Sequence, residues 1–161
     1  MTIQLSTIGY GGSTVEDLLT TLTVAGIETV VDIREIPISR KRGFSKNALR
    51  DQLRSAGIAY EHFRSLGSPR ELRHALRETK DYHRFFDGVA QHLRRDEPQT
   101  DLATVIALAE TRSTCLLCYC PDLTRCHRRK LLEAIERHAE LSVDHLVSGE
   151  PLLTASPPRS P

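Results

Sequence analysis

The sequence predicts an α/β protein, a Rossmann-like three-layer fold with about five mainly parallel strands. Two observations predict this class. Short, β-branched apolar runs alternate along the chain with longer stretches whose apolar residues recur at helical spacing, as in strands joined by crossover helices. The 161 residues can bury one sizeable core and are too few for two, so we expect a single domain over residues 1–149.

The first third of the chain reads as strand, helix, strand. Residues 3–8 form an apolar run that ends at Gly9, and a tight glycine-containing loop follows. Ser13 and Glu16 have the spacing of a capping box, and apolar residues then recur at helical intervals. Residues 27–33 form the second β-branched run, which predicts a second parallel strand.

The middle of the chain is predicted as a loop, a helix, a strand and two polar helices. Residues 34–44 match no regular element and carry a basic cluster, after which Ser45 can cap a helix. Residues 58–63 resemble a third strand. Helical spacing then predicts two helices, near residues 69–78 and 81–95.

The last third completes the alternation. We expect an amphipathic helix over residues 100–111, a buried strand over 114–119, a helix over 126–139 and a final strand over 143–147. Residues 150–161 contain four prolines and little to bury, so we expect a Pro- and Ser-rich disordered tail.

Charge is distributed unevenly along the chain. Residues 34–95 carry 15 Lys and Arg against 7 Asp and Glu, whereas the remainder carries 7 against 14. A basic segment of this size favours phosphate groups or nucleic acid as partners, although solvated helix faces also explain such runs. No apolar run reaches the ~20 residues that cross a bilayer, and no signal-peptide layout is present, so we expect a cytoplasmic protein without membrane contact.

Ligands of open α/β sheets bind beyond the carboxyl ends of the strands. Four predicted loops lie there, at residues 9–13, 32–45, 62–70 and 118–129. They are richer in arginine, histidine and cysteine than the loops at the opposite edge. The sequence therefore predicts the functional site at this edge.

The loop after residue 117 is the most informative of the four. Strand alternation puts Cys118 and Cys120 on one face of the sheet. Cys126, His127 and Arg128 fall near a helix N-terminus, where backbone N–H groups and the helix dipole favour an anion or a thiolate.

Here the sequence resembles a known family, the domain of unknown function family 488 of small bacterial and archaeal proteins. The resemblance covers residues 3 to about 148 and implies a Rossmann-like fold with a shared polar pocket, without an agreed reaction. At Cys120 many members carry an acidic residue. The motifs that carry the resemblance are Thr7-Ile8-Gly9-Tyr10-Gly11-Gly12-Ser13, Val31-Asp32-Ile33-Arg34, Pro37, Ser39-Arg40, Phe44-Ser45-Lys46, Leu66-Gly67, Cys118 and Cys126-His127-Arg128.

Anion recognition is our first hypothesis, with a nucleotide or nucleic acid as the ligand. Arginines of the four loops would bind phosphate groups. The glycines of the first loop would let the protein backbone come close to the same phosphate groups. The structural alternative is that these arginines only form ion pairs with carboxylates at the protein surface. The candidate ligand-binding residues are Gly9, Tyr10, Gly11, Arg34, Arg40, Arg42 and Arg128.

Five residues are candidates for a catalytic role. His127 could act as general acid or base, with Asp32 as an orienting or second acid–base group. Cys118, Cys120 and Cys126 are candidate nucleophiles. Whether the protein is an enzyme stays open, because each of these residues also has a structural interpretation.

The sequence is also compatible with two alternative functions, and its cysteines raise the question of a metal site. Cys120 heads a loop to Arg125 that resembles the persulfide-carrying loop of rhodanese sulfurtransferases, although its glycines are missing. The second alternative is a non-catalytic nucleic-acid-binding or regulatory module. Four cysteines and His127 could bind zinc or an iron–sulfur cluster, but Cys115 should face away from the others, so we assign no metal site. The cofactor and the oligomeric state stay open.

Overall fold

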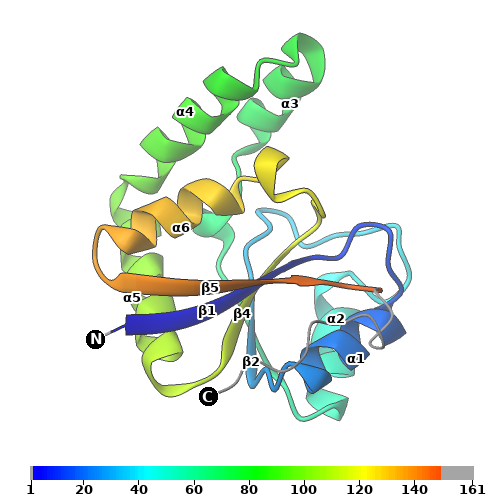
Figure 1. Cartoon of the computed structure of the whole chain (residues 1–161). Coiled ribbons are helices and arrows are strands. Elements are labelled where there is room, and N and C mark those ends of the chain that lie inside the picture. Colours follow the sequence, from blue (N-terminus) through cyan, green and yellow to red (C-terminus); the bar gives the residue numbers. More distant parts are fainter. Residues whose placement is uncertain (1, 150–161) are drawn as a thin grey trace.

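A computed structural model of the protein describes residues 2–149. At its centre lies a five-stranded sheet in the order β3-β2-β4-β1-β5, and all neighbouring strands pair in parallel (Figure 1). The predicted α/β class with about five mainly parallel strands is confirmed. The tail predicted for residues 150–161 lies outside the described residues.

The elements follow the predicted alternation closely. The strands are β1 (Thr2–Gly9), β2 (Thr29–Asp32), β3 (Ala59–His62), β4 (Thr114–Cys118) and β5 (Glu140–Val147). The α-helices are α1 (Val15–Val24), α2 (Lys46–Ser55), α3 (Arg70–Thr79), α4 (Tyr82–Leu93), α5 (Asp96–Thr111) and α6 (Arg128–Glu136). Two short 3₁₀ helices are η1 (Arg64–Leu66) and η2 (Leu123–Arg125).

The sheet is covered on both faces, which makes three layers. Helices α1 and α2 bury their leucines in a core on one face, with residues such as Leu18 and Leu49 fully buried. Helices α4, α5 and α6 build a separate core on the other face, around Phe85, Leu102 and Leu131. The central strands β2 and β4 are therefore buried on both faces, as their apolar sequences require, whereas the edge strands β3 and β5 stay partly exposed.

Alternation along β4 separates the cysteines between these two cores. Cys115 packs in the core under α1 and α2. Cys118 packs with Cys126 in the core under α4, α5 and α6. The prediction that Cys115 faces away from Cys118 is confirmed, because successive strand residues point to opposite faces.

Two predicted helix starts were wrong. The N-cap of α1 is Thr14, whose side chain accepts the N–H of Asp17 at 3.1 Å, whereas Ser13 donates its hydroxyl to the Tyr10 carbonyl. Helix α5 begins at Asp96 and not at residue 100. Pro98 lies in its first turn, where the missing N–H costs no intrahelical hydrogen bond.

Helices α3 and α4 form a hairpin that stands away from the sheet (Figure 1). Close packing joins them, since a Cβ on Gly88 would lie 2.6 Å from Leu72 Cδ2. Among its described side chains α3 has none that is fully buried, so this helix leaves one long side open. That side carries arginines toward the carboxyl edge of the sheet.

Candidate functional site

The site lies at the carboxyl ends of β1 and β4, which run side by side. β1 leads into α1 on one face of the sheet, whereas β4 leads into α6 on the opposite face. Adjacent strands whose connections pass to opposite faces leave a crevice beyond their carboxyl ends. This is the predicted edge of the sheet.

Gly9 lets the loops after β1 and β4 approach each other at that edge. Tyr10 donates its N–H to the Cys118 carbonyl at 3.0 Å, and Gly11 donates to the Tyr119 carbonyl at 2.8 Å. A Cβ at residue 9 would lie 1.9 Å from the Cys120 carbonyl oxygen, so any larger residue would push the loops apart. The glycine therefore serves packing between the loops.

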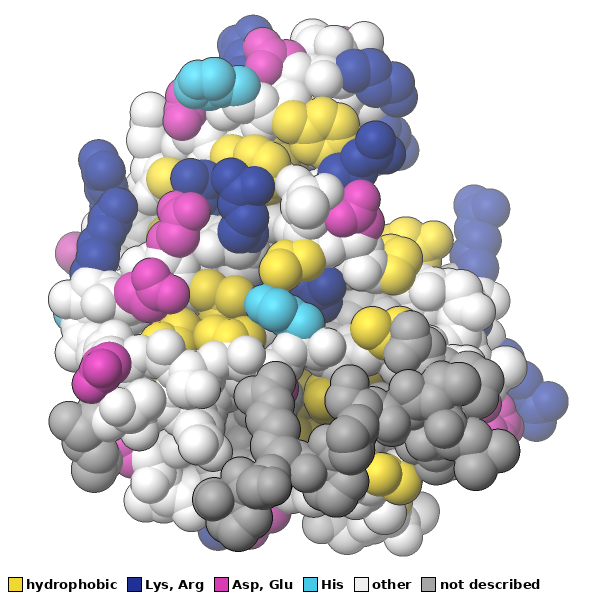
Figure 2. Space-filling view, viewed as in Figure 1, with side chains coloured by type: hydrophobic (Ala, Val, Ile, Leu, Met, Phe, Trp, Pro, Cys, Tyr) yellow, Lys and Arg dark blue, Asp and Glu magenta, His cyan; other side chains and the backbone are white. Residues whose placement is uncertain are grey.

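A cleft of about 710 Å³ opens beside these loops. Its walls come from the loops after β1, β2 and β4, from α3 and from the start of α6. Figure 2 shows Lys and Arg side chains over the part of the surface that α3 and α4 form. The residues that line the cleft are Tyr10, Arg34, Glu35, Ile36, Ile38, Ser39, Arg40, Ser68, Arg73, Leu76, Arg77, Phe85, Cys118, Tyr119, Cys120, Arg125, Cys126 and His127.

The structure brings seven of the twelve candidate residues together in this cleft and leaves five out of its lining. Those in the lining are Tyr10, Arg34, Arg40, Cys118, Cys120, Cys126 and His127. Those outside it are Gly9, Gly11, Asp32, Arg42 and Arg128.

Three lining arginines were not among the candidates: Arg73, Arg77 and Arg125. Arg73 and Arg77 are four residues apart on α3, and this spacing puts both on one helix face. That signal was present in the sequence, but the fold was needed to show that α3 borders the site. Arg125 ends η2 in the loop between β4 and α6, and the sequence points to it only through the resemblance to a persulfide-carrying loop.

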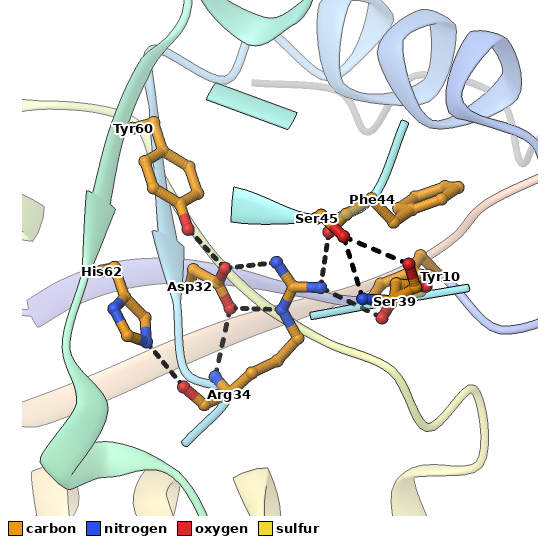
Figure 3. Close-up of polar contacts among 8 residues, drawn as sticks. All are labelled: Tyr10, Asp32, Arg34, Ser39, Phe44, Ser45, Tyr60 and His62. Carbon is orange, nitrogen blue, oxygen red and sulfur yellow. Dashed lines mark hydrogen bonds and ion pairs between the residues drawn. The ribbon is translucent and has the colours of Figure 1, made fainter. Parts of the chain in front are cut away.

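Asp32 and Arg34 form a buried ion pair beneath the cleft (Figure 3). Arg34 Nε donates to Asp32 Oδ1 at 2.9 Å and Nη2 donates to Oδ2 at 2.6 Å, which is the bidentate geometry. The third nitrogen, Nη1, donates to the Phe44 carbonyl at 2.7 Å and to the Tyr10 hydroxyl at 3.1 Å. Arg34 thereby ties the ends of β1 and β2 to the loop before α2.

Asp32 has a second partner, from the edge strand β3. The Tyr60 hydroxyl donates to Asp32 Oδ2 at 2.5 Å, and burial together with the Asp32 charge raises the pKa of Tyr60 above its ordinary value. Burial by itself lowers the pKa of Arg34. The hydrogen bonds and the charge of Asp32 outweigh this effect and raise the pKa above its ordinary value, so the guanidinium stays charged. Asp32 itself is 0% exposed, which keeps it from direct contact with a ligand in the cleft.

The other arginines of the cleft differ in how far they are neutralised. Arg73 pairs with Glu35 at 3.0 Å and also donates to the Ser68 carbonyl. Arg125 lies 3.8 Å from the Asp122 carboxylate in an exposed pair. Within residues 2–149, Arg40 and Arg77 have neither an ion pair nor a side-chain hydrogen bond. Since Glu35 is the one carboxylate in the lining, the cleft has an excess of positive charge.

Two sulfur atoms are in contact on the floor of the cleft, and a third cysteine borders it. Cys118 Sγ lies 3.1 Å from Cys126 Sγ, whereas Cys120 Sγ donates to the Asp122 carbonyl at 3.3 Å. The contact with Cys118 is the main cause that raises the pKa of Cys126, to about 12. Contact with Cys126, then burial, raises the pKa of Cys120. Cys120 and Cys126 are therefore thiols at neutral pH.

His127 is a neutral imidazole held by the backbone. Burial lowers its pKa to about 4, and the nearby charges of Arg73 and Arg128 act in the same direction. Its Nε2 lies 3.0 Å from the Ile33 carbonyl, which can only accept, so Nε2 carries the proton. The unprotonated Nδ1 then faces Cys126 Sγ at 3.8 Å.

Arg128, the first residue of α6, is 2% exposed. Its Nε and Nη1 have no hydrogen-bond partner, whereas its charge lowers the pKa of Cys115 and of Cys120, against the larger effects that raise them. The residue thus adds positive charge behind the cysteines and does not reach the cleft lining.

The described part of the chain contains neither a metal-like group of side chains nor a helix fit to span a membrane. Between residues 2 and 149, no three His, Cys, Asp or Glu side chains are grouped as they would be around a metal ion. No helix in that range has the length and apolar character needed to span a bilayer.

Comparison with protein-family models gives a match over most of the chain. A family model described as "Domain of unknown function DUF488" matches residues 14–135. No curated protein and no solved structure matches the chain. The matched segment runs from the N-cap of α1 to α6 and includes most of the cleft lining. On this match, the chain belongs to the DUF488 family.

Proposed function

We propose that the cleft binds a phosphate-bearing ligand, either a nucleotide or a strand of nucleic acid. The observation that carries the proposal is the pair Arg40 and Arg77. Both guanidinium groups line the same concave surface, they come from different elements, and within residues 2–149 neither has a counterion. An anion with several charged oxygens would neutralise them with bidentate hydrogen bonds.

The apolar part of the cleft supports a ligand with a base in preference to a simple phosphate. Ile38 is 75% exposed and Tyr119 is 62% exposed, and both line the cleft together with the half-exposed Ile36. The Tyr119 ring is held edge-on against Tyr10 at 5.5 Å between centroids. An exposed aromatic ring beside unpaired arginines is the arrangement on which bases of single strands stack.

Salt-dependent binding tests this proposal. Fluorescence anisotropy would follow a labelled single-stranded oligonucleotide over about 50 to 200 mM salt, with mononucleotides as competitors. We expect micromolar binding that weakens steeply with salt. The double variant Arg40→Gln/Arg77→Gln should bind roughly tenfold or more weakly and reduce the slope of log K against log salt by roughly 1.4, because two phosphate contacts are lost.

The matched control is Arg112→Gln. This exposed arginine precedes β4, at the edge of the sheet opposite the cleft, and should change neither affinity nor slope. Absence of binding by the wild-type protein to any of these probes at low salt would refute the proposal. Equal weakening by Arg112→Gln and by the double variant would show that the attraction is general and does not come from the cleft.

A further inference from the structure

Cys118 and Cys126 are two thiols in contact on the floor of the cleft. Cys118 ends β4 and Cys126 precedes α6, and their sulfur atoms lie 3.1 Å apart as free thiols. A covalent S–S bond measures about 2.05 Å, so a further approach of about 1 Å would bring them to bonding distance. Each side chain is only 2% exposed in the core on the α4, α5 and α6 face, and both also border the cleft.

We propose that Cys118 and Cys126 are a redox-active thiol pair, which a hydroperoxide converts into an intramolecular disulfide. The pairing does not depend on which ligand the cleft takes. It would add an oxidation site to the floor of the proposed binding cleft.

Cys126 is the better placed of the two to react first. It directly precedes the N-cap of α6, where the helix dipole favours a developing thiolate and opposes the contact with Cys118 that keeps Cys126 a thiol at rest. The unprotonated Nδ1 of His127 lies 3.8 Å away and can accept the thiol proton. Cys118 then lies behind the reacting sulfur, 3.1 Å from it.

The reaction balances in two steps. The Cys126 sulfur, whose proton passes to His127, attacks the terminal peroxide oxygen; the O–O bond breaks and an S–O bond forms. The leaving oxygen takes up that proton and departs as an alcohol or, from hydrogen peroxide, as water. The Cys118 sulfur then attacks the sulfenic acid at Cys126, loses its own proton and expels water. The two thiols give up two electrons in total, and the hydroperoxide takes them.

The disulfide would close a ring around the loop between the two cysteines. That loop carries Tyr119 and Arg125, which both line the cleft. Oxidation would therefore fix the position of an exposed ring and of an exposed guanidinium at the binding surface.

Peptide mapping of oxidised protein tests the pairing. The reduced full-length chain would be treated with hydrogen peroxide, alkylated, digested with trypsin without reduction and analysed by mass spectrometry. Cleavage after Arg125 separates Cys126 from the other three cysteines, so a disulfide appears as a link between two peptides. We expect a link from Cys126 to Cys118, with the loss of two hydrogen atoms, and its disappearance after dithiothreitol.

Cys120→Ser is the matched control, since Cys120 belongs to the same loop and also lies near Cys126. This variant should form the link as wild type does, whereas Cys118→Ser should not. Fragmentation of the linked wild-type peptides assigns the partner directly, should Cys118→Ser fail to fold. A link from Cys126 to Cys120, or four free thiols after prolonged exposure to peroxide, would overturn the proposal.

Discussion

Replacing Asp32 with alanine is expected to lower the free energy of unfolding by about 3–5 kcal/mol. The substitution leaves the Arg34 guanidinium buried, 7% exposed, without its bidentate counterion. It also removes the acceptor of the Tyr60 hydroxyl. An uncompensated buried charge is costly, and a loss of this size is a large fraction of the stability of an ordinary domain. Urea unfolding followed by circular dichroism measures it.

The exposed pair of Arg50 and Asp51 supplies the control. Their closest atoms are 3.4 Å apart and the Asp51 side chain is 66% exposed, so Asp51→Ala should cost less than about 1 kcal/mol. A similar small loss for Asp32→Ala would mean that the buried pair does not hold the strand ends together.

The stability contributed by a neutral His127 is expected to be lost as pH falls through the window from about 6.5 to about 4. The folded protein lowers the pKa of His127 from 6.5 to about 4, so the unfolded chain binds the proton first. The contribution is complete above the unfolded pKa and disappears as pH approaches the folded pKa. Over this window it is on the order of 3 kcal/mol, the equivalent of the pKa difference.

The variant His127→Gln isolates this effect. Its amide N–H can still donate to the Ile33 carbonyl but cannot gain a proton, and the carboxylates that titrate in the same range are common to both proteins. Urea unfolding at several pH values between about 7 and 4 should show the wild-type stability falling relative to the variant by about 1.4 kcal/mol per pH unit. Parallel curves would show that the folded protein protonates His127 as readily as the unfolded chain.

The framework of the fold could be predicted because its signals are local. β-Branched runs ending at Gly9, Asp32 and Cys118 mark three strands, and parallel strands bring their carboxyl ends to one edge. The position of the cleft follows from those two facts. Helix ends were less certain, since Thr14 caps α1 where the spacing of Ser13 and Glu16 suggested another start.

The partners of individual side chains could not be predicted in this way. Asp32 and Arg34 are two residues apart on a strand end, and only the folded loops show that they bind each other and also contact Phe44 and Tyr60. Arg77 belongs to a helix whose position relative to the sheet depends on packing between α3 and α4. Tertiary packing therefore decides which arginines are neutralised and which stay free in the cleft.

Mapping the ligand onto the protein tests the central claim most directly. Amide resonances of isotopically labelled protein would be followed by NMR during titration with a short single-stranded oligonucleotide. We predict that the shifted resonances cluster around the cleft, at residues 36–40, Arg77 and Tyr119. A second hollow of about 370 Å³ lies at the far edge of the sheet, lined by Arg50, Arg54 and Tyr60. Shifts confined to that hollow would contradict the assignment of the cleft as the binding site.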